Sequence, residues 1–231
     1  MTSALILAGG MGNRLSELGI PKQFAKVAKI PLVMYCIRAF ENSAGIDSIA
    51  IVAQENRQER LRGRLEECGI EKFRTFAPPG RTRQHSILNG LLALQSLNPQ
   101  SVVIHDAARP LVTEQDVGDC IRAFDGHDGA TPVIPLNDTV YQSADGMFVS
   151  SLLNRNELFA GQTPECYKFA PYLEACKALS DEELGDIRGS SEIAFKAGMK
   201  IRLYKGNTQN FKITTAMDFS FFKHLIEERG L

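Results

Sequence analysis

Residues 4–14 read ALILAGGMGNR, and PKQF follows at residues 21–24. The apolar run stops at Gly9 and Gly10, a pattern typical of a buried parallel strand whose carboxyl end leads into a loop lined by backbone. Glycines allow backbone N–H groups to approach an anion closely. Because the cations Arg14 and Lys22 flank this loop in the sequence, the pattern predicts a site for a phosphate chain.

The loop matches neither of the two common nucleotide fingerprints. It lacks the Gly-Lys-Ser/Thr ending of a P-loop and the third glycine of a dinucleotide-binding loop. A Gly-Gly-x-Gly segment after a strand is also compatible with a purely structural turn. The two nearby cations are what favour a nucleotide site.

The composition bounds the partners that we expect. The chain has 231 residues, with 26 basic and 27 acidic side chains and a net charge of −1, which suits one large α/β domain over residues 1–231. Without an overall positive field, we expect neither nucleic acid nor an anionic membrane as a partner. No basic leader precedes the first apolar run, and no apolar stretch approaches the roughly 20 residues of a membrane helix, so we expect a cytoplasmic protein.

The cysteines and histidines predict no metal chemistry of their own. The five cysteines are widely spaced and form no C-x-x-C pair, as expected for reduced structural thiols. The four histidines are scattered and lack the spacing of zinc ligands.

Apolar periodicity predicts alternating strands and helices over most of the chain. The expected strands cover residues 4–8, 48–53, 72–77, 101–104, 130–135 and 200–204. The expected helices cover residues 31–40, 56–68, 113–124, 169–179, 190–197 and 216–228. A further helix is expected to open at residues 78–86, and Thr113 is the expected cap of the helix over residues 113–124. This alternation predicts an α/β fold of three layers around a mostly parallel, twisted, Rossmann-like sheet with right-handed crossovers. The apolar residues of the last helix are Met217, Phe219, Phe221, Phe222, Leu225 and Ile226, and its aromatic side chains are expected to lie in the core.

One segment interrupts this alternation. Residues 138–142 and 147–152 flank Ser143-Ala144-Asp145-Gly146, which predicts a β-hairpin with an Asp-Gly turn. An isolated hairpin is only marginally stable in water. We therefore expect a protruding arm, at about residues 137–157, that packs on a second subunit of a homodimer.

Two further polar segments follow predicted strands. Gly80, Arg83 and Ser86 combine a glycine turn, a cation and a hydroxyl at a helix start, which forms a second candidate phosphate cradle. Asp106 follows a buried strand and is placed to hold Mg²⁺ against nucleotide phosphates. The alternatives are that Arg83 faces solvent, and that Asp106 caps a turn and pairs with Arg109. Because three strand ends now carry groups that suit phosphate, and ligands in open α/β sheets bind at that edge, we favour a functional site.

Several segments together carry a family resemblance: LAGGMGNR with PKQF, GRTRQHSILNGL, HDAARPLV, NDTV, GQTP and NFKITT. In this order and spacing, and over essentially the whole chain, they resemble the methylerythritol-phosphate cytidylyltransferase family and the related ribitol-5-phosphate cytidylyltransferases. The resemblance implies a nucleotidyltransferase fold and a reaction in which CTP and a polyol phosphate give a CDP-alcohol and pyrophosphate. Such a transfer depends on positioning and charge stabilisation, and it needs no dedicated nucleophile.

The resemblance also implies roles for individual residues. Arg14 and Lys22 would stabilise charge on the α-phosphate, and Lys212 completes the implied catalytic set. The implied nucleotide-binding residues are Ala8, Gly9, Gly10, Gly12, Gly80, Arg83 and Ser86, with Ser86 near the base. Asp106 would hold the Mg²⁺ ion. Arg109, Thr139 and Lys212 would bind the acceptor phosphate, while Arg155 and Thr163 would reach the site of the partner subunit.

Some positions depart from the family pattern. Arg188-Gly189 stands where relatives usually have Thr-Asp, Gln209 replaces a common acid, and Pro79 replaces a second glycine. The departures at Gly189 and Gln209 raise, as an alternative, a nucleotide-binding protein that has lost catalysis.

The acceptor is the second open point. HDAARPLV and NGLLAL resemble the methylerythritol branch, whereas the glycine before QTP, residues 179–183 and KITT at residues 212–215 lean toward the ribitol branch. We expect 2-C-methyl-D-erythritol 4-phosphate as the acceptor, with D-ribitol 5-phosphate as the alternative. A dinucleotide-dependent oxidoreductase is disfavoured by the incomplete loop motif, and a related glycosyltransferase is disfavoured because Asp106 has no closely spaced second carboxylate in the sequence.

Overall fold

A twisted central sheet organises the protein in the computed structural model, which describes residues 1–10 and 21–228. Its strands follow the order β10-β7-β11-β6-β1-β4-β5, and β12 pairs with the free side of β7. The strands are β1 (Thr2–Leu7), β4 (Ser48–Val52), β5 (Phe73–Ala77), β6 (Ser101–Asp106), β7 (Gly129–Pro135), β10 (Phe159–Gly161), β11 (Glu165–Lys168) and β12 (Ile201–Lys205).

Most of the sheet is parallel, as the sequence predicts. Strand β1 pairs in parallel with β4 and β6, β4 with β5, and β7 with β12. The exceptions are β10, which runs antiparallel along β7, and β11, which lies antiparallel between β6 and β7. The sequence analysis predicted neither of these two short strands. Strand β11 matters for the site because it brings Glu165 opposite Ile104, two residues before Asp106.

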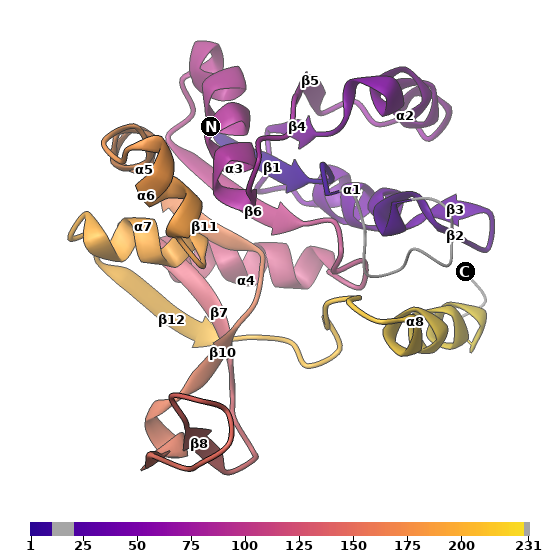
Figure 1. The fold of residues 1–231 in the computed structure, drawn as a ribbon. Helices are drawn as coiled ribbons and strands as arrows, with labels where there is room; N and C mark the ends of the chain where they lie inside the picture. Colours follow the sequence, from indigo (N-terminus) through magenta and orange to yellow (C-terminus); the bar gives the residue numbers. More distant parts are fainter. Residues whose placement is uncertain (11–20, 229–231) are drawn as a thin grey trace.

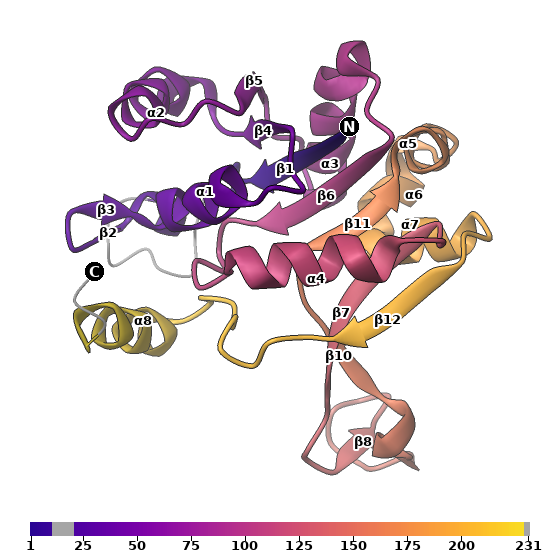
Figure 2. The same cartoon turned by 180° about the vertical axis from the view of Figure 1, so that it is seen from behind.

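Helices cover both faces of the sheet, which confirms the three-layer prediction (Figures 1 and 2). One face carries α1 (Leu32–Asn42), α2 (Glu55–Glu67) and α4 (Glu114–Phe124). The other carries α3 (Arg83–Leu94), α5 (Phe169–Lys177), α6 (Asp181–Asp186) and α7 (Ser190–Lys196). Strand β1 shows why the sheet needs both layers: Ala4 and Ile6 pack with the first group, whereas Leu5 packs with the second. Thr113 caps α4 in a capping box with Asp116, as predicted.

A smaller core holds the carboxyl-terminal helix. Helix α8 (Ala216–Glu228) packs near a short hairpin of β2 (Lys26–Val27) and β3 (Ile30–Pro31), which follows the 3-10 turn η2 (Lys22–Phe24). Phe222 and Ile226 are buried there, but Met217 is 81% exposed and Phe221 is 53% exposed. The prediction that the aromatic residues of this helix enter the core is therefore wrong for Phe221, because Phe222 and Ile226 are four residues apart and share the buried face of the helix, whereas Phe221 lies beside that face. Two further 3-10 turns are η3 (Gln95–Leu97) and η4 (Arg155–Glu157).

The arm is a separate two-stranded ribbon that projects beyond β7 and β10 (Figures 1 and 2). Its strands are β8 (Val140–Gln142) and β9 (Ser151–Leu153). Pairing stops at Gln142 and Ser151, so residues 147–150 are loop and the predicted tight Asp-Gly turn is wrong. The Asp145 carboxylate accepts hydrogen bonds from the backbone N–H groups of Met147 (2.8 Å) and Phe148 (3.0 Å). Those bonds hold the backbone of residues 145–148 in a turn, which prevents these residues from pairing as strands.

Across residues 1–10 and 21–228, no helix combines the length and the apolar character needed to cross a membrane. All five cysteines are free thiols, and four of them are buried, in agreement with the sequence prediction.

Candidate active site

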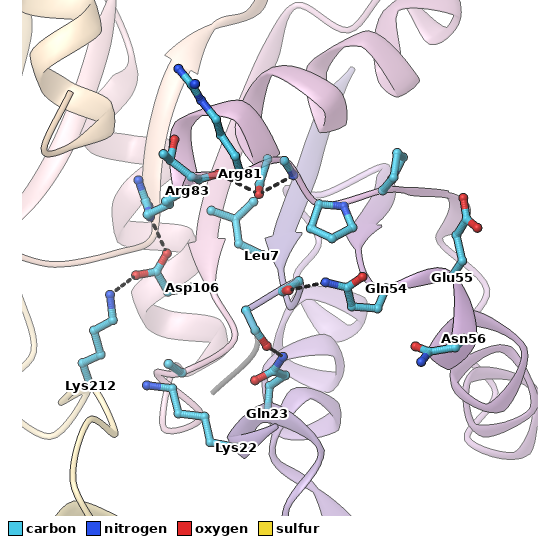
Figure 3. Close-up of a pocket in the computed structure, with 18 residues that line it drawn as sticks. Leu7, Lys22, Gln23, Gln54, Glu55, Asn56, Arg81, Arg83, Asp106 and Lys212 are labelled. Carbon is cyan, nitrogen blue, oxygen red and sulfur yellow. Dashed lines mark hydrogen bonds and ion pairs between the residues drawn. The ribbon is translucent and has the colours of Figure 1, made fainter. Parts of the chain in front are cut away.

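A pocket of about 1130 Å³ opens at the carboxyl ends of β1, β4, β5 and β6 (Figure 3). Segments that directly follow these strands supply much of its wall. The predicted site residues that line it are Gly9, Gly10, Lys22, Gly80, Arg83, Ser86, Asp106 and Lys212. The structure therefore confirms that the polar strand ends converge, as expected for an open α/β sheet.

The glycine loop is held against the second cradle. A Cβ atom on Gly9 would lie 2.5 Å from Cβ of Pro79, so the close approach of the two loops requires glycine at this position. The side-chain amide of Gln23 donates to the carbonyl oxygens of Ala8 (2.7 Å) and Gly10, and Gln54 donates to that of Gly9 (3.3 Å). Gln23 is a supporting residue that the sequence analysis did not single out, although it lies within the quoted PKQF segment. Ala8 is buried behind the pocket wall.

Lys22, next to Gln23, contacts the connection between β12 and α8. Its Nζ donates to the carbonyl oxygen of Ile213 at 2.6 Å, the residue after Lys212. Both cations therefore belong to one wall of the pocket. The predicted residues Gly12 and Arg14 lie outside the described residues.

The second cradle is a rigid turn at the start of α3. Thr82 caps the helix by accepting from the backbone N–H of His85. The Ser86 hydroxyl accepts from Gly80 N–H (3.0 Å) and donates to the carbonyl oxygen of Thr82 (2.9 Å). A Cβ atom on Gly80 would lie 2.3 Å from Cβ of His85. Gly80 and Ser86 thus fix the shape of the loop that lines the pocket.

Asp106 is the centre of an ion-pair cluster. Its Oδ1 accepts from Nε of Arg83 (2.8 Å), and its Oδ2 accepts from Nζ of Lys212 (2.7 Å). Burial disfavours the charged carboxylate, but the positive charges of Arg83 and Lys212 outweigh that effect and lower the pKa of Asp106 well below its usual range. The ion pairs of Asp106 thus run to Arg83 and Lys212, and not to Arg109 as in the alternative reading of the sequence. Arg83 is paired at the pocket and does not simply face solvent.

The donor set at Asp106 suits a cation bound together with phosphates. Among the described residues, no group of three or more histidine, cysteine or acidic side chains could enclose a metal ion. Mg²⁺ commonly takes only one or two protein carboxylates and completes its shell with substrate phosphates and water. Each carboxylate oxygen of Asp106 accepts one hydrogen bond and has a second acceptor site. Asp106 therefore fits the role of a single protein ligand.

Glu165 and Ser190 form a buried layer behind Arg83. Nη1 of Arg83 donates to Oγ of Ser190 (2.8 Å), and the Ser190 hydroxyl donates in turn to Oε2 of Glu165. Burial raises the pKa of Glu165, and the charge of Arg83 opposes that shift. The sequence analysis missed both residues. The only available signal was an acid next to the quoted GQTP segment.

His105 braces the loop that carries Asp106. Its Nε2 lies 3.1 Å from the carbonyl oxygen of Arg109, which can only accept, so Nε2 carries the proton. Nδ1 then accepts from the Thr163 hydroxyl (3.1 Å), whose oxygen accepts from Asp106 N–H (3.2 Å). Thr163 is buried behind Asp106 of its own chain, so the expectation that it reaches the site of the partner subunit is wrong. Burial lowers the pKa of His105 to about 4, which keeps the ring neutral.

The remaining predicted residues lie outside the pocket wall. Arg109 donates from Nη1 to the carbonyl oxygen of Asn210 (2.9 Å) and from Nη2 to that of Gly161 (3.4 Å). Thr139 and Arg155 are exposed on the arm, where Nη1 of Arg155 donates to the carbonyl oxygen of Asn137 (2.6 Å). A single chain thus does not bring the arm residues to the pocket.

The three departures from the family pattern, at Gly189, Gln209 and Pro79, lie in different parts of the structure. Gly189 is the N-cap residue of α7 and directly precedes Ser190. The backbone N–H of Gln209 donates to Oδ1 of Asn207 at 2.9 Å. Neither Gly189 nor Gln209 lines the pocket, whereas Pro79 does.

Comparisons with known proteins agree with this geometry. A family model described as "IspD: 2-C-methyl-D-erythritol 4-phosphate cytidylyltransferase" matches residues 2–228. The 2-C-methyl-D-erythritol 4-phosphate cytidylyltransferase of Rubrobacter xylanophilus is 35% identical, over 98% of this chain and 95% of that protein. The ribitol-5-phosphate cytidylyltransferase of Vibrio parahaemolyticus is 31% identical, over 98% of this chain and 96% of that protein.

The fold is shared with solved structures as well. The crystal structure of 4-diphosphocytidyl-2C-methyl-D-erythritol synthase from Anaerococcus prevotii superposes with a TM-score of 0.84 at 23% identity, covering 98% of this chain and 96% of that chain. The full-length match of sequence and fold shows that the chain belongs to the IspD family of cytidylyltransferases, which are nucleotidyltransferase enzymes.

Proposed function

We propose that this protein transfers a cytidylyl group from CTP to 2-C-methyl-D-erythritol 4-phosphate. An oxygen of the acceptor phosphate attacks the α-phosphorus of CTP. The bond from that phosphorus to the bridging oxygen breaks, and pyrophosphate leaves with the electron pair. The observation that carries the proposal is the meeting of two glycine cradles with Lys22, Arg83, Asp106 and Lys212 in one pocket of a cytidylyltransferase fold.

Some residues of the pocket bind the nucleotide, and others stabilise the charge that develops during transfer. The loop at Gly9–Gly10 presents backbone to the nucleotide, where N–H groups bind phosphate oxygens. The loop at Gly80, whose own N–H donates to the Ser86 hydroxyl, shapes the adjoining wall of the pocket. Lys22 and Lys212 supply positive charge on one wall, where negative charge grows during transfer. By family analogy, Arg14 belongs to the same set.

Mg²⁺ is part of the proposal. Asp106 would be its protein ligand, together with oxygens of the nucleotide. When bound, a divalent cation offsets phosphate charge and orients the chain for in-line displacement.

The proposed assembly is a homodimer in which the arm, residues 137–157, completes the site of the neighbouring subunit. Tyr141, Met147, Phe148, Val149 and Leu152 are all exposed on this arm. An exposed apolar set on a thin ribbon supports an interface with another chain. Thr139 and Arg155 lie on the same arm and would thereby reach an acceptor in the other pocket.

D-Ribitol 5-phosphate is the second candidate acceptor, because a relative with that name is 31% identical over nearly the whole chain. The deciding experiment measures pyrophosphate release from CTP and Mg²⁺ with each acceptor in parallel. We expect release with the methylerythritol phosphate and much less with the ribitol phosphate. Release with ribitol phosphate alone would reassign the acceptor. Binding of CTP without release with either would leave a nucleotide-binding protein and overturn the enzymatic proposal.

A further inference from the structure

The cytidylyl transfer proposed above makes no use of Glu165, although this acid lies directly behind the pocket. Its side chain is 7% exposed, and Ser190 beside it is 1% exposed. Both lie on different elements, at the start of β11 and at the start of α7. A buried carboxylate is costly unless it is paired and hydrogen-bonded, so its partners indicate what it supports.

Those partners lead to Arg83. The Glu165 carboxylate accepts from the Tyr167 hydroxyl on Oε1 (3.2 Å) and from the Ser190 hydroxyl on Oε2. Its Oε2 also lies 3.8 Å from Nη2 of Arg83. Because the Ser190 hydroxyl donates to Glu165, its oxygen is a stronger acceptor for Nη1 of Arg83, which donates to it at 2.8 Å.

Arg83 is consequently held at all three guanidinium nitrogens. Nε donates to Asp106, Nη1 donates to Ser190, and Nη2 faces Glu165. A planar guanidinium with three such contacts has one orientation only. Because Nε of Arg83 donates to Asp106, a fixed guanidinium also fixes the position of the Asp106 carboxylate in the pocket (Figure 3).

We infer that Glu165 and Ser190 are positioning residues, which act through Arg83 to hold the nucleotide-binding face of the pocket and the Asp106 carboxylate in their working geometry. This inference rests on the proposed function for its kinetic consequence. The contact geometry behind it is independent of that function.

The kinetic test uses Ser190→Ala and Glu165→Gln. Losing one charge-assisted hydrogen bond should raise KM for CTP about tenfold, while KM for the polyol phosphate changes by less than about twofold. The matched control is Tyr172→Phe, since the Tyr172 hydroxyl donates to the backbone oxygen of Ser190 (3.1 Å) and not to its side chain. A merely structural role for this layer would give the control and Ser190→Ala the same kinetic defect, which would overturn the inference.

A double variant tests the route through Arg83. Lysine has no Nη1, so in an Arg83→Lys background the added Ser190→Ala change should alter KM for CTP by less than about twofold. An undiminished tenfold effect in that background would show that Ser190 acts by another route.

A spectroscopic readout separates this inference from the proposed function. The Nε–H resonance of Arg83, assigned by its loss in Arg83→Lys, should exchange with water several-fold faster in Ser190→Ala than in the wild type and in Tyr172→Phe. Unchanged exchange would overturn the positioning role. If the wild type releases no pyrophosphate with either acceptor, the proposed function fails, and this exchange measurement still decides the inference.

Discussion

At the scale of single residues, His105 couples the active-site loop to pH. The ring is fully buried and connects the Arg109 carbonyl to the Thr163 hydroxyl. Burial is the main reason that its pKa falls to about 4 from the usual 6.5, and the negative charge of Asp106 only partly opposes this. A charged His105 would also turn Nδ1 from an acceptor into a donor, which breaks the bond from Thr163.

The sign of the resulting pH dependence follows from proton binding. Between pH 6.5 and about 4 the unfolded chain takes up a proton at His105 that the native protein does not, so stability falls as pH is lowered through this window. The lost free energy of unfolding is roughly 3 kcal/mol over the whole window. Urea unfolding of the wild type at pH 7 and at pH 4.5 measures the loss.

The variant His105→Asn isolates this contribution, since the raised pKa of Glu165 gives a contribution of opposite sign in acid. The variant is expected to be less stable at pH 7 and to lose less stability on acidification than the wild type. Equal losses in the two proteins would contradict the assignment to His105.

Lys212 gives the residue-scale prediction for turnover. Its Nζ lies 2.7 Å from Asp106, and its side chain is 40% exposed in the pocket. Lys212→Met removes positive charge where the transfer builds negative charge, and such losses typically reduce turnover by about 100-fold or more. Pyrophosphate release measures it, with Lys205→Met, an exposed lysine of β12, as the control. A turnover for Lys212→Met equal to that of the control would remove Lys212 from the catalytic set.

At the scale of elements, the contact between the glycine loop and the loop after β5 sets the mouth of the pocket. An added Cβ at Gly9 meets Cβ of Pro79 at 2.5 Å, whereas an added Cβ at Gly10 has nothing within 4 Å. Overpacking of this kind costs roughly 1–3 kcal/mol, which lowers Tm by about 5 °C in a protein of this size. We expect Gly9→Ala to show that loss in thermal unfolding without nucleotide, and Gly10→Ala to melt within about 1 °C of the wild type. Equal Tm values for the two variants would mean that the loops separate at little cost.

The helices and strands also show which parts of the structure can be predicted from the sequence. Apolar periodicity predicted the parallel strands and their helices, because each buries one regular face. The strand ends predicted that polar groups gather at one edge of the sheet, but the ion pair between Asp106 and Arg83 was not predicted. The antiparallel strand β11 has four residues. Such a short segment does not show the alternation of apolar and polar residues from which a strand is predicted. The contact between Glu165 and Ser190 could not be predicted because it joins residues 25 positions apart through that unpredicted strand. On the arm, the Asp145 carboxylate accepts hydrogen bonds from the N–H groups that follow it, and these bonds compete with strand pairing. The turn preferences used to predict a hairpin do not include this competition.

At the scale of the whole molecule, the arm raises the question of what covers its apolar side chains. Phe148 is 75% exposed and Met147 is 78% exposed, on a ribbon separate from the central sheet. In the proposed homodimer these side chains are buried against the second subunit. Replacing Phe148 by Asp should therefore shift the mass measured by sedimentation from dimer toward monomer. Met217→Asp on α8, which is 81% exposed, is the control and should leave the dimer intact. A monomeric wild type would contradict the proposal directly.

The dimer makes a sharper prediction if each arm serves the neighbouring pocket. Arg155→Ala then disables the site of the other subunit, whereas Lys212→Met disables its own. In a mixed dimer of the two variants, one pocket carries both defects, and the other combines an intact Lys212 with an intact Arg155 from the opposite chain. Random mixing gives half mixed dimers with one working site of two, so activity should return to about one quarter of the wild-type value although each variant alone is inactive. Pyrophosphate release after co-refolding measures this recovery. If Arg155 instead serves the pocket of its own chain, both defects in the mixture stay separate, every pocket carries one of them, and no activity returns.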